Sequence, residues 1–114
     1  HMAYEQFQWY GMAVGESTIE SIIWNGRYIQ SAIDKNIEVT AIYRKDEKIN
    51  LCNSMRAKDA NIRQALIDRF AKKDKKSGKG TKKDPDVFYG VTKDVWQAIA
   101  VGVTWFDMEK ERER

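Results

Sequence analysis

The sequence predicts a small α/β fold with a parallel sheet and three main helices. Two stretches alternate between apolar and polar residues, as strands do, and a long stretch with helical spacing separates them. This order implies two parallel strands joined by a crossover helix, with two further helices behind them. The length of 114 residues suits one domain, which we place at residues 3–108. Residues 1–2 look like a cloning scar or start, and residues 109–114 form a charged tail that we expect to fray.

The first strand is expected in "YEQFQWYGM" and the first helix in "STIESIIWNGRYIQSAIDKN". Alternation along the strand puts four residues on one face: Ala3, Glu5, Phe7 and Trp9. At the start of the helix, Ser17 and Glu20 have the spacing of a capping box. Isoleucines then recur at helical spacing and predict an apolar face.

The second strand is expected in "IEVTAIY", which is rich in β-branched residues. A charged turn, "RKDEK", leads through "INLCNSM" to a helix in "AKDANIRQALIDRFAKK". The lysine-rich loop, residues 74–86 ("DKKSGKGTKKDPD"), separates this helix from the last one, which begins near Thr92. The last helix is expected to bury five apolar residues: Val95, Trp96, Ile99, Val103 and Phe106.

Composition excludes several classes of function. The only histidine is His1, which rules out catalytic or metal-binding histidine clusters. The single cysteine, Cys52, cannot form an internal disulfide, and we interpret it as a buried, inert thiol in a reducing compartment. No apolar run reaches the roughly 18–20 residues of a membrane span. The net charge of +3 does not by itself indicate an anionic partner.

Two carboxylates are candidate metal ligands, and each also has a simpler interpretation. Glu5 is either a solvated side chain near a strand end or an acid on the sheet face toward the last helix. Asp94 lies in the first turn of the last helix, where the helix dipole alone favours a carboxylate. Together they offer the oxygen ligands that Mg²⁺ prefers, and phosphodiester hydrolysis often uses such ions. Asp84 and Asp86 are weaker candidates in the lysine-rich loop.

The lysine-rich loop is the third candidate feature. It is either a solubilising surface or a segment that follows a phosphate backbone, with Gly78 and Gly80 giving it the flexibility to wrap. We expect the tryptophans Trp24, Trp96 and Trp105 in the core rather than in base stacking. Nucleic-acid binding is assigned to seven lysines: Lys48, Lys58, Lys75, Lys76, Lys79, Lys82 and Lys83.

Four stretches together resemble the RuvC-like Holliday junction resolvases of bacteriophages and prophages: "EQFQWYGMAVGES", "LCNSMRAKDANIRQALIDRF", "KGTKKDP" and "YGVTKDVWQAIAVGVTW". They cover most of the chain from Ala3 to Phe106. The resemblance implies an RNase H-like fold and a structure-specific endonuclease that cuts four-way DNA junctions. It also implies Mg²⁺ or Mn²⁺ as the cofactor, a homodimer, and the cytoplasm of a bacterium or phage-infected host.

The resemblance gives roles to individual residues. Glu5 matches one of the family's metal-binding carboxylates, and Asp94 matches the acidic or histidine position at the start of its final helix, so both are expected to be catalytic. Lys48 and Lys58 fall close to basic positions that the family directs toward DNA phosphates. The first helix corresponds to an element that helps such proteins dimerise, and a two-fold dimer suits the two symmetric cuts that a junction needs.

Two departures from the family are visible. An essential aspartate in a D-x-G type motif precedes the matched region in the family, and none precedes Ala3, so we expect an N-terminally truncated form. The family's last acid aligns with Gln97, a neutral amide that binds metal more weakly. Three hypotheses remain: an endonuclease with impaired turnover, an inactive protein that still dimerises and binds DNA by charge, and a remnant that only folds.

Overall fold

The computed structural model describes residues 1–113. The chain forms two strands and four helices in the order β1 (Met2–Glu5), α1 (Glu16–Asp34), β2 (Val39–Ile42), α2 (Arg44–Cys52), α3 (Asp59–Phe70) and α4 (Lys93–Arg112). The two strands pair in parallel, with α1 as the connection between them. The predicted α/β class, the parallel pairing and the crossover helix are therefore confirmed.

The register of the sheet sets where both strands end. Glu5 lies opposite Ile42, and the next hydrogen bond, from the Gln6 N–H to the Ile42 carbonyl, spans 2.9 Å. The chain turns into α2 directly after Ile42, so β1 has no partner strand beyond this point. The expectation of a longer first strand is therefore wrong, and Phe7 and Trp9 do not continue the strand face of Glu5.

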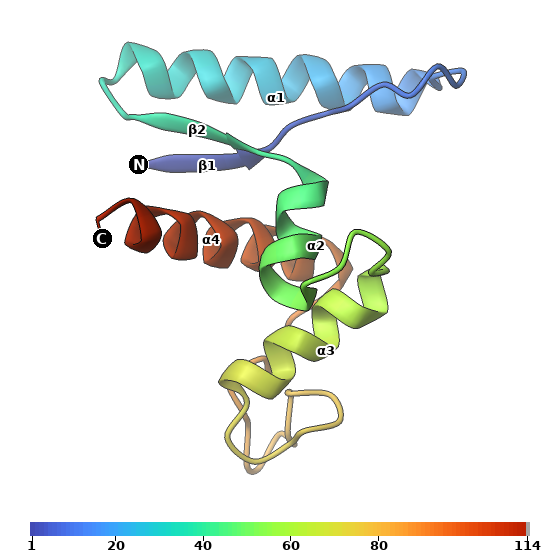
Figure 1. The fold of residues 1–114 in the computed structure, drawn as a ribbon, viewed down its shortest axis with the longest axis vertical. Helices are drawn as coiled ribbons and strands as arrows, with labels where there is room; N and C mark the ends of the chain where they lie inside the picture. Colours follow the sequence, from blue (N-terminus) through green and yellow to red (C-terminus); the bar gives the residue numbers. More distant parts are fainter. Residues whose placement is uncertain (114) are drawn as a thin grey trace.

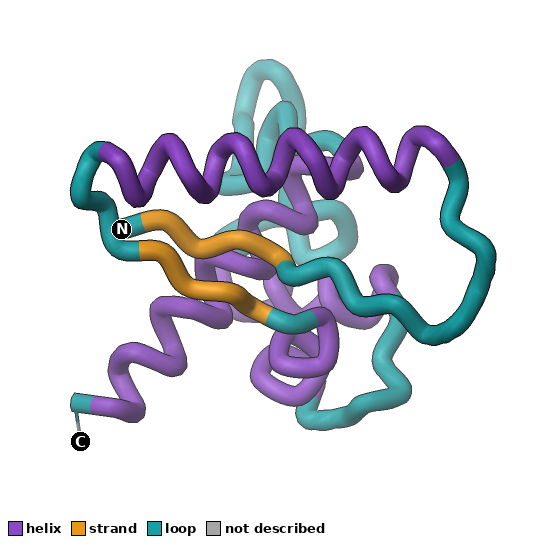
Figure 2. Tube along the Cα trace, turned by 90° about the horizontal axis from the view of Figure 1, so that it is seen from above, coloured by secondary structure: helices purple, strands orange, loops and turns teal. Residues whose placement is uncertain are grey.

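The sheet lies between two helices (Figure 1). α4 contacts both strands as well as α2 and α3, whereas α1 lies on the other side of the sheet and contacts β2. Seen from above, α1 runs along the strands (Figure 2). The lysine-rich loop lies at the opposite end of the molecule's longest axis from α1 (Figure 1). Among residues 1–113, no helix combines the length and the apolar character that crossing a bilayer requires.

The apolar core lies between α3, α4 and the segment that joins them. Leu66 is fully buried, and the rings of Phe88 and Trp96 pack at an interplanar angle of 40° with their centroids 4.6 Å apart. The core cluster consists of Ile62, Leu66, Ile67, Ala71, Phe88, Trp96 and Ala100. The half-buried Cys52 packs against this cluster, and burial raises the pKa of its thiol. The expected full burial of Cys52 is thus wrong, although a raised thiol pKa keeps it protonated and unreactive.

α1 differs most from its expected packing. Its apolar residues are exposed rather than buried, with Ile23 at 51% and Trp24 at 53%, and Ala32 is its one fully buried residue. The physical reason is that, in the described chain, β2 is the main element that packs against this helix. The expected capping box is also absent, because the helix begins at Glu16 with Gly15 as its N-cap.

α2 replaces the charged turn that was expected after β2. The Asp46 carboxylate accepts a hydrogen bond from the Tyr43 N–H at 3.1 Å, which satisfies a free donor at the helix start. The protein therefore has four helices rather than three.

α4 also departs from expectation on its surface and at its end. Val95 and Phe106 are 45% and 47% exposed, because the helix turns Trp96, Ala100, Val101 and Thr104 inward. The fraying of the charged tail stays a prediction, and the described part of the tail is largely helical. α4 continues to Arg112, whose guanidinium pairs with Glu109 at 2.9 Å. Only residue 114 of the tail lies outside the described range.

Candidate functional site

Glu5 ends β1 at the edge where both parallel strands finish. Ligands of open α/β sheets commonly bind at this edge. The Glu5 side chain is about one-third exposed, at 32%, and its Oε1 lies 4.0 Å from Nη1 of Arg44, the first residue of α2. The expected position of Glu5 near a strand end holds, and the cation that faces it belongs to the chain itself.

Glu47 is a second acid at this edge, and the sequence interpretation missed it. Its side chain is fully buried, and its Oε1 accepts a hydrogen bond from Arg44 Nη1 at 3.3 Å. Its Oε2 is buried without a hydrogen-bond partner among the described residues. Burial, and after it the adjacent Glu5 carboxyl, raise the pKa of Glu47 from 4.5 to about 8, because together they outweigh the lowering by Arg44.

Arg44 connects these acids to a third one. Its Nη2 forms an ion pair with Asp59 at the start of α3, so one guanidinium meets carboxylates from β1, α2 and α3. We call Arg44, Glu5, Glu47 and Asp59 the Arg44 cluster. The sequence carried one signal of it, the three-residue spacing of Arg44 and Glu47, which places both on one face of a helix. That signal was lost because the segment was interpreted as a turn.

A groove of about 780 Å³, which we call the strand-end groove, opens beside the cluster. Basic residues Lys45 and Lys48 line it together with Glu5 and Arg44. Its remaining lining is largely polar and aromatic and includes Phe7, Tyr10, Trp24 and Tyr28. The expectation that Trp24 belongs to the core is wrong, whereas Trp96 is buried as expected and Trp105 is half-buried. The groove therefore combines positive charge with exposed aromatic rings.

Asp94 is exposed in the first turn of α4 and lines neither of the two cavities that Arg44 borders. Gln97, one turn further along, lines the smaller cavity of about 40 Å³ together with Arg44 and Asp59. The structure thus brings Gln97, rather than Asp94, to the Arg44 cluster. Glu5 and Asp94 do not line a common cavity.

The residues at this edge do not fit Mg²⁺ as they are arranged. Mg²⁺ is held by carboxylates that are free to face it. Within residues 1–113, no group of three or more histidine, cysteine, aspartate or glutamate side chains is placed to hold a metal ion. The acids that do meet, Glu5 and Glu47, already face the guanidinium of Arg44. The negative charge at this edge is compensated by Arg44, a cation of the chain itself.

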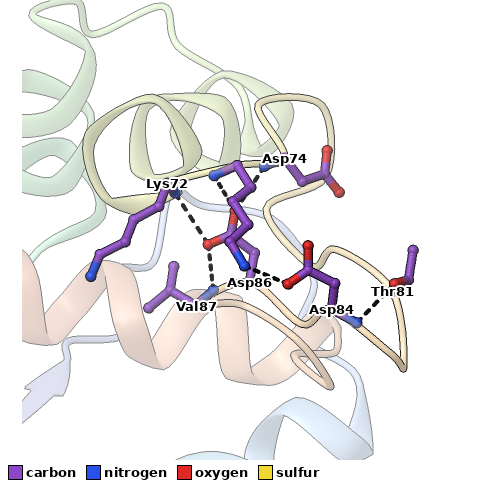
Figure 3. Close-up of polar contacts among 7 residues, drawn as sticks. Lys72, Asp74, Thr81, Asp84, Asp86 and Val87 are labelled. Carbon is purple, nitrogen blue, oxygen red and sulfur yellow. Dashed lines mark hydrogen bonds and ion pairs between the residues drawn. The ribbon is translucent and has the colours of Figure 1, made fainter.

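The lysine-rich loop is ordered by the two aspartates at its ends. The Asp86 carboxylate accepts four backbone hydrogen bonds, three from residues 72–74 and one from Val87, as Figure 3 shows in part. Its pKa is held far below the usual range because these N–H groups stabilise the charged form. Asp74 accepts N–H bonds from Lys76, Ser77 and Gly80, and these and the Ser77 hydroxyl lower its pKa to about 2.

The two glycines of the loop adopt backbone conformations that residues with side chains rarely adopt. Gly78 and Gly80 have φ values of +71° and +68°, which favour glycine. A Cβ on Gly80 would lie 2.5 Å from the Asp84 carbonyl oxygen, and one on Gly78 would lie 2.6 Å from Phe88 Cδ2. The loop is therefore a fixed scaffold that carries lysines.

The predicted nucleic-acid-binding lysines fall into two separate regions. Lys48 lies on α2 in the strand-end groove, and Lys58 is the exposed N-cap of α3. In the loop, the Lys75 ammonium donates to the Ala71 carbonyl at 2.6 Å. Four other lysines of the loop are exposed or half-buried: Lys76, Lys79, Lys82 and Lys83. The predicted basic patch is thus divided between the α2–α3 region and the lysine-rich loop.

In comparisons with known proteins, the chain matches no protein-family model, no curated protein and no solved structure.

Proposed function

We propose that this chain acts on branched DNA as a structure-specific endonuclease of the Holliday junction resolvase type. The observation that carries the proposal is the strand-end groove, where the acid Glu5 lies beside Arg44, Lys45 and Lys48. An acid at the carboxyl end of a parallel strand, within a basic cleft, suits the handling of a phosphodiester. Mg²⁺ or Mn²⁺, a homodimeric state, an RNase H-like fold and a bacterial or phage-infected cytoplasm belong to the same proposal.

The presence of two separate basic regions favours a branched DNA partner over a short linear one. Residues of β1, α1 and α2 line the strand-end groove, whereas the lysine-rich loop lies at the end of the longest axis away from α1 (Figure 1). The molecule measures 40 × 38 × 30 Å. Its long dimension corresponds to about 12 base pairs at roughly 3.4 Å per step. Separate lysine groups on one molecule of this size suit contacts with two arms of one junction.

A second candidate function is junction binding without cleavage. The Arg44 cluster favours it, because the carboxylates near the groove are already paired with a guanidinium. Gln97 also stands beside Arg44 where the resemblance places an acid. Under this alternative the groove and the lysine-rich loop hold DNA by charge alone.

Binding is tested with a synthetic four-way junction in a mobility-shift assay without metal. Replacing Lys82 and Lys83 together by Gln should weaken binding and reduce the slope of log affinity against log salt by about 2, since two phosphate contacts are lost. The matched control replaces Lys35 and Lys110, which lie outside both basic regions, and should leave the slope unchanged. Absence of junction binding by the wild-type chain at low salt would reject both candidate functions.

Cleavage is tested on the same junction with Mg²⁺ and then with Mn²⁺. Nicking by the wild-type protein that Glu5→Gln abolishes, with binding retained, supports the endonuclease. Binding without nicking under either ion selects the second candidate.

A further inference from the structure

Two helices line the strand-end groove with different chemistry. α1 contributes the aromatic residues Trp24 and Tyr28, whereas α2 contributes Lys45 and Lys48. Residues three or four positions apart share one face of a helix, so each pair acts together. A ligand in the groove therefore meets aromatic rings from one helix and ammonium groups from the other.

The two rings of α1 are open to solvent. Trp24 is 53% exposed and Tyr28 is 62% exposed, and their ring centroids lie 6.2 Å apart. Arg27, which does not line the groove, places its guanidinium carbon 4.7 Å from the centroid of the Trp24 ring. This cation occupies one face of the indole, and a ligand in the groove can stack on the other face.

The two lysines of α2 are available to an anion. Among residues 1–113, neither the Lys45 nor the Lys48 ammonium group forms an ion pair. Glu5, the one acid that lines the groove, faces Arg44 instead. The lining thus carries three cations against one acid, a balance that attracts a phosphate backbone.

We propose that the strand-end groove binds single-stranded DNA, with unpaired bases stacked on Trp24 and Tyr28 and phosphates held by Lys45 and Lys48. Aromatic side chains stack on bases whose faces are not already covered in a duplex, and together with basic residues they are typical of single-strand binding. The 6.2 Å between the rings exceeds the rise of about 3.4 Å per base in duplex DNA, so it suits an extended strand. The inference deepens the proposed function, on which it rests for the choice of DNA, by naming the form of DNA that this groove takes.

Binding of a short fluorescent oligothymidylate, which forms no duplex, tests the proposal by fluorescence anisotropy. Trp24→Leu keeps an apolar side chain and removes the ring, so the affinity for oligothymidylate should fall about ten-fold. The affinity for an oligomer of the same length that keeps the phosphates but lacks the bases should not change.

The contribution of charge is measured separately with the double variant Lys45→Gln and Lys48→Gln. Both oligomers should bind it more weakly than the wild type. The slope of log affinity against log salt should be reduced by about 1.4, since each lost phosphate contact of a single strand contributes about 0.7.

Phe106→Leu is the matched control for the ring. Phe106 is a 47% exposed aromatic residue on a helix, lies outside the groove, and also has a cation over its ring, from Lys110. Trp24→Tyr keeps an aromatic ring and should retain most of the affinity. Circular dichroism shows whether each variant folds, and Tyr28→Leu provides the same test if Trp24→Leu does not.

Equal affinity of the wild type and the folded Trp24→Leu for oligothymidylate overturns the proposal. So does an equal loss in Phe106→Leu, or a loss of the same size on the oligomer without bases. The four-way junction is tested in parallel to separate this inference from the proposed function. Junction binding by a wild type that does not bind oligothymidylate rejects the inference alone. Oligothymidylate binding that depends on Trp24, without junction binding, rejects the proposed function alone.

Discussion

The Glu47 carboxyl group is the most strongly perturbed acid at the strand edge. Its pKa is raised to about 8, first by burial and then by the neighbouring Glu5 carboxyl. The folded protein therefore holds a proton on Glu47 at pH values where the unfolded chain, with a pKa near 4.5, has released it. Stability from this proton is fully present below pH 4.5 and is lost as the pH rises to about 8.

Glu47→Gln should remove this pH dependence. We expect the wild-type free energy of unfolding to fall across the window from pH 4.5 to about 8, by about 1 kcal/mol per pH unit. The Gln variant keeps the shape of the side chain without a titrating proton, so its free energy of unfolding should fall much less. Urea unfolding at several pH values within the window measures the difference.

Glu20→Gln on the exposed surface of α1 is the control and should keep the wild-type dependence. Equal slopes for the wild type and Glu47→Gln would show that Glu47 is ionised throughout the window.

The two acids of the strand edge differ in how far the sequence reveals them. Glu5 was identified because it stands in an alternating stretch and within a family resemblance. Glu47 was missed because charged residues in a helix are ordinarily exposed, and nothing in the local spacing shows that β1, α3 and α4 close over it. Burial of an acid is a property of tertiary packing.

At the scale of elements, the lysine-rich loop owes its order to hydrogen bonds rather than to a buried core. Asp86 accepts bonds from the backbone of Lys72, Lys73, Asp74 and Val87. Such a carboxylate has no apolar substitute, because its removal leaves several donors unpaired at once. The geometry of the lysines depends on this one side chain.

Asp86→Ala should loosen the loop while leaving the helices intact. Amide hydrogen exchange at Lys72, Lys73 and Val87 should accelerate by about ten-fold or more, because these N–H groups lose their acceptor. Asp84→Ala is the matched control, since the Asp84 carboxylate pairs with the exposed Lys73 ammonium and accepts no backbone N–H bond in the described structure, and the substitution leaves the Asp84 carbonyl that Thr81 bonds. Unchanged exchange in Asp86→Ala, measured by mass spectrometry or NMR, would contradict this account of the loop.

The elements were predictable to different degrees. β2 was found because Val39, Thr40 and Ile42 are β-branched, and the parallel pairing followed from the long helix between the strands. α2 was missed because its residues are mostly charged and short of apolar periodicity. The buried face of α4 differs from the predicted one. Periodicity identifies the apolar stripe of a helix, but the elements that pack against the helix decide which part of that stripe is buried. Val95 and Trp96 illustrate this difference, since only the tryptophan is buried.

At the scale of the whole molecule, apolar residues are distributed unevenly. One side holds the core between α3 and α4, whereas α1 exposes Ile19, Ile22, Ile23 and Ile33 at 39–51%. Contiguous exposed apolar surface on this scale commonly marks a contact with another protein. We infer a homodimer in which α1 contributes the interface, in keeping with the symmetric cuts of the proposed function.

Ile23→Glu should convert a dimer into a monomer, because it places a charge at the centre of the α1 face. Sedimentation at micromolar concentration measures the change, and circular dichroism should show an unchanged helix content since Ile23 is exposed within the protomer. Val87→Glu, at an exposed site beside the lysine-rich loop, is the control and should remain dimeric. A wild-type protein that sediments only as a monomer would contradict the inferred homodimer.

The positive φ angles of Gly78 and Gly80 limit how the basic end of the protein can be re-engineered. Any side chain on Gly80 collides with main-chain atoms, which have no way to yield. The neighbouring Lys79 and Lys82 project from the same scaffold without such a limit. In a variant library built on this segment, the charge at the lysines can therefore be varied, whereas the two glycines must be kept. Affinity for an anionic partner is then adjustable without a change in the backbone that carries the lysines.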